Sequence, residues 1–418
     1  MDKRHFLKKL GSAALISPFM TLPLQAEPKT AKPYPKTNNA FWERIRADYE
    51  LKTDYINLEN GYYNLIPKPT MQRYMEHISM VNYEASFYMR TVQWDNKDKV
   101  RDRLAALVGV SPDTLIITRN TTESLDMVIG GYPWKKGDEA IFAYQDYGAM
   151  QDHFKLIAKR YGVVNRIISL PNHPDSDTDI VSLYESQITP KTRLLMVCHM
   201  VNITGQLLPI RKICDMAHKY GVEVMVDGAH CVGHFDFSIQ DLNCDYYGSS
   251  LHKWLSAPLG CGLLYVKKEH IPKIWPLFAD YTNEIPEIKR LNHTGTIPVH
   301  NDLAIADAMD YLEIMGLKRK EERLRFLQFY WSDALRDVEH IEVNTPKDKT
   351  RSCGIGNIGI THIKPAQLAT TLLQEFKIFT VAIDQENVQG CRITPNVYTT
   401  TKELDVFISA MKNLAARV

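Results

Sequence analysis

A carboxylate and an amine stand at the ends of two neighbouring apolar runs in the middle of the chain. Asp227 closes the run 222–226, and Lys253 ends a second run shortly afterwards. If both runs are strands of one sheet, an anion and an amine face each other across a space that a cofactor ring could fill. Pyridoxal phosphate (PLP) needs this pair, an anion at its pyridine nitrogen and an amine for its aldehyde. The alternative is that Asp227 and Lys253 are unrelated surface residues.

Three further groups that a PLP site needs follow earlier strands. Thr121 and Thr122 stand between a strand and a helix, where hydroxyls and helix-start N–H groups bind phosphate. Tyr147 is placed to stack on a pyridine ring, and the amide of Asn202 to donate to its phenolic oxygen. Each has an ordinary explanation: a helix cap formed by Asn120, simple aromatic packing, and turn chemistry. Their order favours a cofactor site, because each group follows a successive strand.

The two central segments carry three more polar groups. Next to a pyridine nitrogen, a buried Asp227 keeps the ring protonated and makes it an electron sink. We predict that His230 reaches the ring oxygen and that Ser250 and His252 reach the phosphate. The competing interpretation of His230 is a structural histidine. Burial and cationic neighbours would lower the pKa of Lys253, which makes its amine a nucleophile.

The composition excludes several other classes of protein. The 418 residues include 50 Lys and Arg against 49 Asp and Glu, which gives no reason to expect nucleic acid as a partner. No apolar run reaches the ~20 residues that cross a bilayer, so we expect a protein that is not embedded in a membrane. The seven cysteines are scattered, without C-x-x-C or zinc spacing, so we expect neither a metal site nor a disulfide framework.

The first 26 residues have the composition of an export signal. Basic residues cluster in 3–9, a short apolar segment covers 13–24, and Ala26 could precede a cleavage site. The order Lys-Arg-His-Phe-Leu-Lys within 3–8 resembles a twin-arginine signal with lysine in place of the first arginine. We therefore expect export to the periplasm. A cytoplasmic protein with a frayed N-terminal helix is the alternative.

Strands and helices alternate between residues 115 and 266, which predicts a mostly parallel α/β sheet with helices on both faces. In such sheets ligands bind at the carboxyl ends of the strands. Long helices and short strands follow, which is typical of a smaller α+β unit. The predicted strands are 115–117, 140–142, 163–170, 194–198, 222–226, the run that ends at Ser250, and 261–266. The predicted divisions are a linker and N-terminal helix at 27–50, a large PLP-binding domain at 51–300 and a small C-terminal domain at 301–418.

From about residue 55 onward the chain resembles the class V aminotransferase family of fold-type I PLP enzymes. The segments Val-Asp-Gly-Ala-His at 226–230 and Ser-Ser-Leu-His-Lys-Trp at 249–254 carry most of this resemblance. It implies that Asp227 binds the pyridine nitrogen and that Lys253 bonds the aldehyde. It also implies a set of further cofactor contacts: Thr121, Thr122, Asn202, Ser250 and His252.

The resemblance adds two expectations elsewhere in the chain. The segment Thr-Gly-Thr at 294–296 is similar to the family segment whose threonine reaches the phosphate of the other subunit. Through Thr296 it therefore implies a homodimer with shared active sites. Arg392 resembles the arginine that holds the substrate α-carboxylate in a bidentate pair.

The chain also departs from the desulfurases of this family. They stack a histidine on the ring where this chain has Tyr147, and they carry a nucleophilic cysteine on a loop where 380–385 has none. Tyr147 and the segment Asn-Gly-Tyr-Tyr at 60–63 resemble the isopenicillin N epimerase branch instead. This branch implies that Asn60 and Tyr62 bind substrate together with Arg392.

We therefore expect a PLP enzyme that acts at the α-carbon of an amino acid or of a peptide-linked amino acid. Lys253 removes the α-proton; reprotonation on the other face gives epimerisation, and reprotonation at the cofactor gives transamination. The candidates for the second acid are Tyr62, Tyr63, Tyr147 and His230. The alternatives are a lyase that acts on a C–S bond or removes a β-substituent, as a cysteine desulfurase does, and a non-catalytic PLP-fold binding protein.

Overall fold

The computed structural model describes residues 38–280, 285, 287–385 and 387–418. The chain divides into two compact units, Met1–Arg44 and Ile45–Val418. The described part of the first unit is the start of helix α2 (Asn38–Ala47). The predicted export signal at 1–26 and most of the predicted linker lie outside the described residues. The fold and the site below concern the second unit.

A seven-stranded sheet forms the large domain of this unit. Its strand order is β2-β8-β7-β6-β5-β3-β4, and among these strands only β8 runs antiparallel to its neighbours. Strands with both faces buried read as continuous apolar runs, which is why the sequence signal was clear. The predicted mostly parallel sheet is confirmed. The bounds are β2 (Leu115–Thr118), β3 (Glu139–Ala143), β4 (Val164–Ile168), β5 (Thr192–Cys198), β6 (Glu223–Asp227), β7 (Tyr246–Ser250) and β8 (Gly262–Val266).

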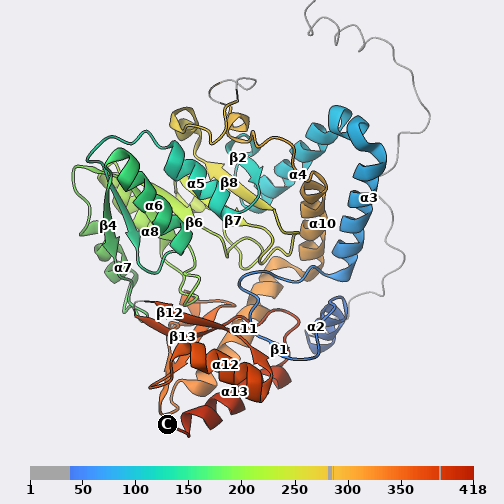
Figure 1. Ribbon diagram of the computed structural model, residues 1–418, viewed down its shortest axis with the longest axis vertical. Helices are drawn as coiled ribbons and strands as arrows, with labels where there is room; N and C mark the ends of the chain where they lie inside the picture. Colours follow the sequence, from blue (N-terminus) through green and yellow to red (C-terminus); the bar gives the residue numbers. More distant parts are fainter. Residues whose placement is uncertain (1–37, 281–284, 286, 386) are drawn as a thin grey trace, which may run out of the picture. The chain divides into compact units, whose positions relative to one another are not determined.

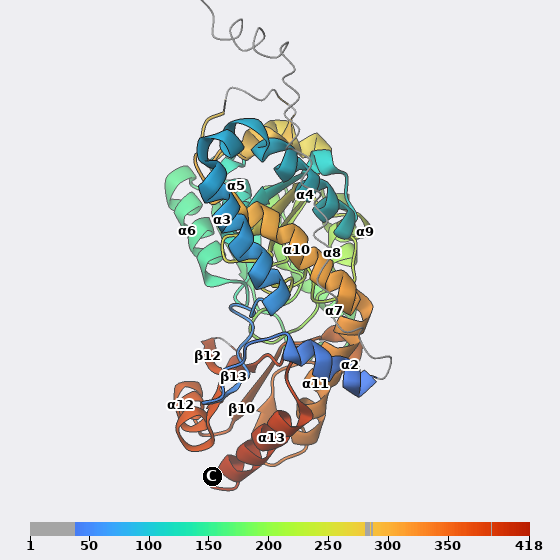
Figure 2. The ribbon, with the colours of Figure 1, turned by 90° about the vertical axis from the view of Figure 1, so that its right-hand side faces the viewer.

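Helices cover both faces of this sheet (Figure 1, Figure 2). Figure 2 shows α5 and α6 on one side, with α7 and α8 on the other. The core between them includes Leu125, Phe142, Met196, Met225 and Leu264. The helix bounds are α3 (Lys68–Thr91), α4 (Gln93–Leu107), α5 (Thr121–Gly131), α6 (Gly148–Tyr161), α7 (Asp177–Glu185), α8 (Ile210–Lys219), α9 (Ile239–Leu242) and α10 (His300–Met315). None of the helices in the described ranges is long and apolar enough to cross a bilayer.

A four-stranded antiparallel sheet, in the order β12-β13-β10-β9, forms the small domain. Its helices pack around a second apolar core that includes Trp331, Ile358, Leu372 and Phe407. The strand bounds are β9 (Ile341–Val343), β10 (Gly356–Ile360), β11 (Ile378–Phe379), β12 (Val381–Gln385) and β13 (Val388–Ile393). The helix bounds are α11 (Leu317–Leu335), α12 (Pro365–Phe376) and α13 (Thr401–Ala415).

Two segments lie in a different domain from the one that the sequence suggests. Strand β1 (Ile56–Asn57) pairs with β11, and Leu58 belongs to the small-domain core, although 51–300 was predicted to be the large domain. Helix α10 follows the predicted boundary at residue 300 but packs on α3 and α4, as Figure 2 shows for α3. The boundary itself stays a prediction. The change to long helices marks α10 in the sequence, but its packing partners come from far upstream.

The carboxyl ends of the parallel strands meet at one edge of the large sheet. Cys198, Asp227 and Ser250 end adjacent strands there, and α5 begins directly beyond β2. This is the edge at which open α/β sheets bind ligands. The small domain reaches the same edge through β13, which carries Arg392.

Candidate active site

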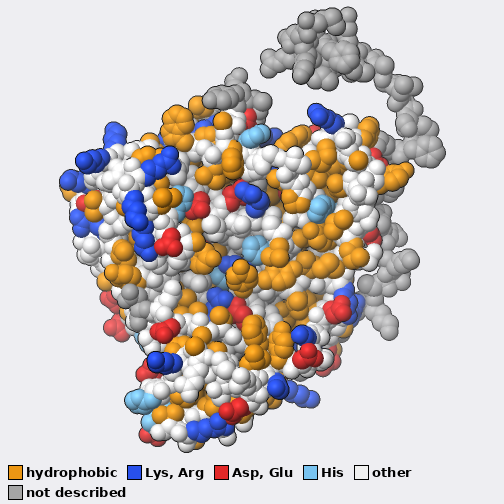
Figure 3. All heavy atoms as spheres, viewed as in Figure 1, with side chains coloured by type: hydrophobic (Ala, Val, Ile, Leu, Met, Phe, Trp, Pro, Cys, Tyr) orange, Lys and Arg blue, Asp and Glu red, His pale blue; other side chains and the backbone are white. Residues whose placement is uncertain are grey.

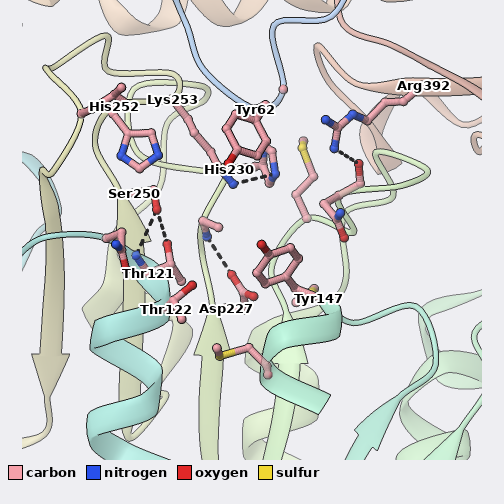
Figure 4. A pocket seen from close by; sticks show the side chains of 18 of the residues that line it. Tyr62, Thr121, Thr122, Tyr147, Asp227, His230, Ser250, His252, Lys253 and Arg392 are labelled. Atoms are coloured by element: carbon pink, nitrogen blue, oxygen red, sulfur yellow. Dashed lines mark hydrogen bonds between the residues drawn. The ribbon is translucent and has the colours of Figure 1, made fainter. Parts of the chain in front are cut away.

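A cavity of about 290 Å³ opens at this edge of the sheet (Figure 4). It brings together most of the residues singled out in the sequence, from five strand ends and from the small domain. Those that line it are Tyr62, Thr121, Thr122, Tyr147, Asn202, Asp227, His230, Ser250, His252, Lys253 and Arg392. Asn60 and Thr296 are not among its lining residues.

The start of α5 forms the phosphate end of the cavity. The Asn120 side chain caps the helix by accepting a hydrogen bond from the N–H of Glu123 at 2.8 Å. The Thr121 N–H donates to Ser250 Oγ at 3.0 Å, and the two hydroxyls lie 2.7 Å apart. The helix cap and the proposed phosphate contacts therefore coexist, because the cap uses Asn120 while the hydroxyls of Thr121 and Ser250 lie at the cavity (Figure 4).

Asp227 lies at the opposite end with its carboxylate almost fully buried. One oxygen accepts a hydrogen bond from the N–H of Ala229 at 2.9 Å. Burial raises the pKa of Asp227, and the backbone hydrogen bond and the charge of Lys253 oppose this shift. A buried carboxylate is stable in its charged form only beside a cationic partner. A protonated pyridine nitrogen is such a partner.

Lys253 projects into the cavity between these two ends. Burial lowers its pKa to about 8, against the attraction of Asp227. Its Nζ lies 3.1 Å from Nε2 of His230, and the indole N–H of Trp254 donates to Nδ1 of the same ring at 3.2 Å. His230 is 3% exposed, and burial holds its pKa well below the ordinary value. His230 therefore faces the reactive amine and is also firmly held in the structure. Its predicted contact with the ring oxygen of the cofactor stays a prediction.

Arg392 is held by a carboxylate that sequence reasoning missed. Its Nη2 and Nε donate to the two oxygens of Glu59 at 2.6 and 3.1 Å, and its Nη1 donates to the backbone oxygen of Asn202 at 3.2 Å. Both side chains of the ion pair are less than 10% exposed. A guanidinium has five N–H groups, so one remains on each terminal nitrogen for a bidentate carboxylate. In the sequence, Glu59 is marked only by its place between a short strand and Gly61. In the structure, Arg392 packs closely on that glycine, because a Cβ added to Gly61 would lie 2.9 Å from Arg392 Cζ.

Asn60, which was predicted to bind substrate, does not line the cavity. Its side chain is fully buried, and its amide donates to the backbone oxygen of Thr394 at 2.7 Å. Its oxygen accepts from the hydroxyl of Tyr398 at 2.6 Å and from the amide of Asn57 at 3.0 Å. Asn60 therefore fixes the chain between β1 and the cavity, because its hydrogen-bonding groups point into the small domain.

Two of the four candidate acids stand free at the cavity. Figure 4 shows the phenol groups of Tyr62 and Tyr147 at the space beside Lys253, and these side chains are 76% and 47% exposed. Tyr63 does not line the cavity, and burial raises the pKa of its phenol. His230 contacts Lys253, the expected base, so it lies on the same side of the cavity as that base.

The region compared with the desulfurase loop is part of a sheet. Residues 381–385 form β12, which pairs with β13 and carries no thiol. All seven cysteines are buried, and Cys198 is the one among the described residues that lines the cavity. Burial raises its pKa well above the ordinary value, so it is a poor nucleophile.

Thr296 is exposed and lies outside this cavity. Its predicted role concerns the site of a second subunit. It stays a prediction.

The lining residues fit pyridoxal phosphate. His252 Nδ1 is buried at the cavity and lacks a hydrogen-bond partner among the described residues. Buried polar atoms without partners are rare and point to a bound group. The amide of Asn202, Asp227, the α5 start with Ser250 and His252, and the amine of Lys253 would hold the phenolic oxygen, the pyridine nitrogen, the phosphate and the aldehyde.

Comparisons with known proteins agree with this assignment. Over 401 residues the chain is 27% identical to isopenicillin N epimerase of Streptomyces clavuligerus, covering 90% of this chain and 98% of that protein. It is 28% identical to a cysteine desulfurase of Cronobacter sakazakii, covering 73% and 80%. The apo structure of a cysteine desulfurase from Thermococcus onnurineus superposes with a TM-score of 0.78 at 20% identity, covering 90% and 98%.

The structure of a related lyase shows the cofactor within this fold. A cystine C–S lyase with glycine covalently linked to PLP superposes with a TM-score of 0.79 at 19% identity, covering 88% of this chain and 99% of that one. The family model described as class-V aminotransferase matches residues 65–407. The match spans both domains and every lining residue discussed above except Tyr62 and Gly61, so this chain belongs to the class V aminotransferases, a family of PLP-dependent enzymes.

Proposed function

We propose that the protein is a PLP-dependent epimerase that inverts the α-carbon of an amino acid or of a peptide-linked amino acid. The observation that carries the proposal is that the amine of Lys253 and the phenol of Tyr62 lie at one cavity that Arg392 also lines. Inversion requires one group that removes a proton and another that returns a proton from a different direction.

The protein side chains divide this work by position. PLP, when bound, supplies an aldehyde and a ring that accepts electrons from the α-carbon. Arg392 holds the substrate carboxylate with its two remaining N–H groups. Lys253, with its pKa lowered to about 8, takes the α-proton, and the phenol of Tyr62 returns one. The backbone N–H of Tyr62 donates to Glu59 at 2.9 Å, which anchors this residue to the carboxylate that also holds Arg392.

Access to the cavity supports a substrate larger than a free amino acid. Its lining includes Tyr62 and Leu259, which are 76% and 58% exposed. An open rim of this kind leaves room for the rest of a peptide beyond the α-carbon. The similarity to isopenicillin N epimerases favours the same class of reaction.

The aminotransferase and lyase alternatives use the same cofactor and the same base. Neither requires Tyr62, because the proton then goes to the cofactor or a β-substituent leaves. A desulfurase also needs an accessible thiol, and the buried cysteines of this chain argue against one.

The test is exchange of the α-proton in deuterated water over a panel of amino acids and short peptides, with chirality and keto acids followed together. We expect deuterium incorporation with inversion and no keto acid. Lys253→Ala should abolish both exchange and inversion. Tyr62→Phe should still exchange the proton of one enantiomer but lose inversion by about 100-fold, the size of a missing general acid. Tyr147→Phe is the matched control for Tyr62→Phe. Formation of a keto acid would instead favour the aminotransferase.

We also propose a homodimer with shared sites. Support comes from α3, where Met71, Met75 and Ile78 are spaced by one helical turn and are 37%, 56% and 41% exposed. Figure 3 shows hydrophobic side chains gathered over α3 and α10. Exposed apolar patches of this kind mark interfaces. Analytical ultracentrifugation should give twice the chain mass, and a monomer would overturn the proposal.

Export to the periplasm is proposed from the first 26 residues alone. Cell fractionation of the full chain should find the mature protein in the periplasm. Arg4→Gln should retain it in the cytoplasm, and unchanged export would point to another route.

A further inference from the structure

A buried tryptophan lies directly behind the cofactor lysine. The Trp254 side chain has no exposed area, and its indole N–H donates to Nδ1 of His230 at 3.2 Å. An indole nitrogen can only donate, because its lone pair belongs to the ring. Nδ1 of His230 therefore carries no proton, and His230 is neutral.

The other nitrogen of His230 faces Lys253. A neutral imidazole without a proton on Nδ1 carries it on Nε2. Nε2 lies 3.1 Å from Nζ of Lys253, so its N–H needs a lone pair on that nitrogen. An ammonium group has no lone pair, and a neutral amine has one. The contact therefore requires a neutral Lys253.

We propose that Trp254 is a positioning residue, which fixes the proton of His230 on Nε2 so that His230 donates to Lys253 and favours its neutral, nucleophilic form. The inference rests on Lys253 being the PLP lysine, and it is independent of which α-carbon reaction follows. The same N–H is the donor that His230 needs if it is to reach the phenolic oxygen of the cofactor.

Trp254 is itself held from several sides. The ring of His234 stacks on it with centroids 3.7 Å apart. Nε2 of His234 accepts from the N–H of Gly354 at 2.8 Å, so its proton is on Nδ1, which donates to the backbone oxygen of His230 at 2.8 Å. Lys320, buried in α11, donates to the backbone oxygen of Trp254. The indole therefore has little freedom to turn away from His230.

The remaining charged groups around Lys253 act in both directions. Asp227 and Glu59 attract the ammonium form, whereas Arg392 and burial favour the neutral amine. Other titratable groups around this pair are Cys198, Cys231, His234 and His252, and the phenols of Tyr62 and Tyr147 lie at the same cavity. The hydrogen bond from His230 also favours the neutral amine. A substitution at residue 254 removes this effect and leaves every charged group in place.

The test compares the full chain, freed of cofactor, with its Trp254→Phe variant. Phenylalanine keeps a buried ring beside His234 but has no N–H, so the His230 proton can move to Nδ1. Nε2 then accepts from an ammonium group and favours it. We expect acetylation of Lys253 by acetic anhydride near pH 7, measured by peptide mass spectrometry, to fall about fivefold, with its pH midpoint raised. This is the factor for one hydrogen bond of ordinary net strength.

Trp331→Phe is the matched control, since Trp331 is equally buried and its indole N–H has no hydrogen-bond partner among the described residues. We expect it to leave the acetylation midpoint of Lys253 unchanged. An unchanged midpoint in Trp254→Phe, or an equal shift in both variants, would overturn the proposal.

A measurement on the wild type keeps the test valid if Trp254→Phe fails to fold. Nitrogen NMR of histidine-labelled protein, with the His230 signal assigned by its loss in His230→Gln, should show a bare Nδ1 and a protonated Nε2. A proton on Nδ1 refutes the inference. Neither measurement uses turnover, so its result is separate from the outcome of the epimerase test.

Discussion

At the scale of single residues, Lys253 and Arg392 are set in opposite ways for the same substrate. The amine of Lys253 is deprived of solvent and faces the donor Nε2 of His230, so it loses its proton easily. The guanidinium of Arg392 is bound side-on by the carboxylate of Glu59. Lys253 is therefore set to act as a base, and Arg392 is fixed in place to hold a carboxylate.

The pKa of Lys253 predicts how PLP uptake depends on pH. Only the neutral amine attacks an aldehyde, so uptake is fast above the pKa of about 8 and slows below it. Between pH 8 and pH 6 the rate should fall about 50-fold, because the neutral fraction falls about fivefold from pH 8 to pH 7 and about ninefold from pH 7 to pH 6. Stopped-flow absorbance of cofactor-free protein mixed with PLP measures this, with Lys253→Ala as the blank. A constant rate over this range would contradict the prediction.

Gly61→Ala tests the placement of Arg392. The new Cβ would lie 2.9 Å from Cζ of Arg392, closer than real contacts allow, so the guanidinium must shift away from its place beside Glu59. We expect the KM for the best substrate of the panel to rise about tenfold, because a bidentate pair is lost, while the visible cofactor band remains.

Gly148→Ala is the control, because no atom lies within 4 Å of its added Cβ. An unchanged KM in Gly61→Ala would mean that Arg392 does not hold the substrate carboxylate.

Residues whose chemistry is required by the cofactor could be predicted, and those that act through another residue could not. Asp227 and Lys253 stand out because a strand end with a buried charge needs a reason. Glu59 and Trp254 look ordinary in the sequence, because their partners lie 333 and 24 positions away. The sequence predicts a site role for Asn60 and not for its neighbour Glu59. Which of the two side chains points to the site depends on the path of the β1 segment, and the sequence does not determine that path.

At the scale of elements, the phosphate end depends on how closely β8 approaches the start of α5. A Cβ added to Gly262 would lie 2.7 Å from backbone atoms of Asn120, the helix cap. Backbone cannot yield as a flexible side chain does, so the first turn of α5 must move. The helix-start N–H groups would then no longer converge on an anion.

Gly262→Ala is therefore expected to weaken the binding of PLP more than that of pyridoxal, which lacks the phosphate. We expect the dissociation constant for PLP, measured by absorbance titration, to rise about tenfold, and that for pyridoxal to change little. Gly148→Ala again serves as the control. Equal losses for both ligands would show a general disturbance of the cavity instead of a damaged phosphate site.

The large sheet could be predicted because most of its strands carry an apolar run of their own. The small domain was harder, because its two-residue strand β11 is too short to show a pattern and the pairing of the short strand predicted at 55–58 with β11 leaves no local signal. The segment 381–385 was compared with a loop because its residues are only half-buried, and its pairing with β13 depends on a partner rather than on its own sequence. Packing between distant segments, such as α10 on α3, leaves no local signal.

At the scale of the whole molecule, the site is assembled from both domains. The large domain supplies the groups for PLP, and the small domain supplies Arg392 and, through Lys320 and Gly354, the support for Trp254 and His234. Relative movement of the domains would therefore change carboxylate binding and the state of Lys253 together. The proposed second subunit adds a third source of groups through Thr296.

Shared sites can be tested by mixing two defective subunits. Lys253→Ala cannot bond the cofactor, and in the proposed dimer Thr296→Ala would remove a phosphate contact from the site of the partner. In a mixed dimer both changes fall in one site, while the other site has an intact Lys253 and an intact Thr296. After subunit exchange, a PLP titration of the visible band should show a tight-binding fraction that neither variant shows alone. If Thr296 served the site of its own chain, each site would carry one change, and mixing would restore nothing.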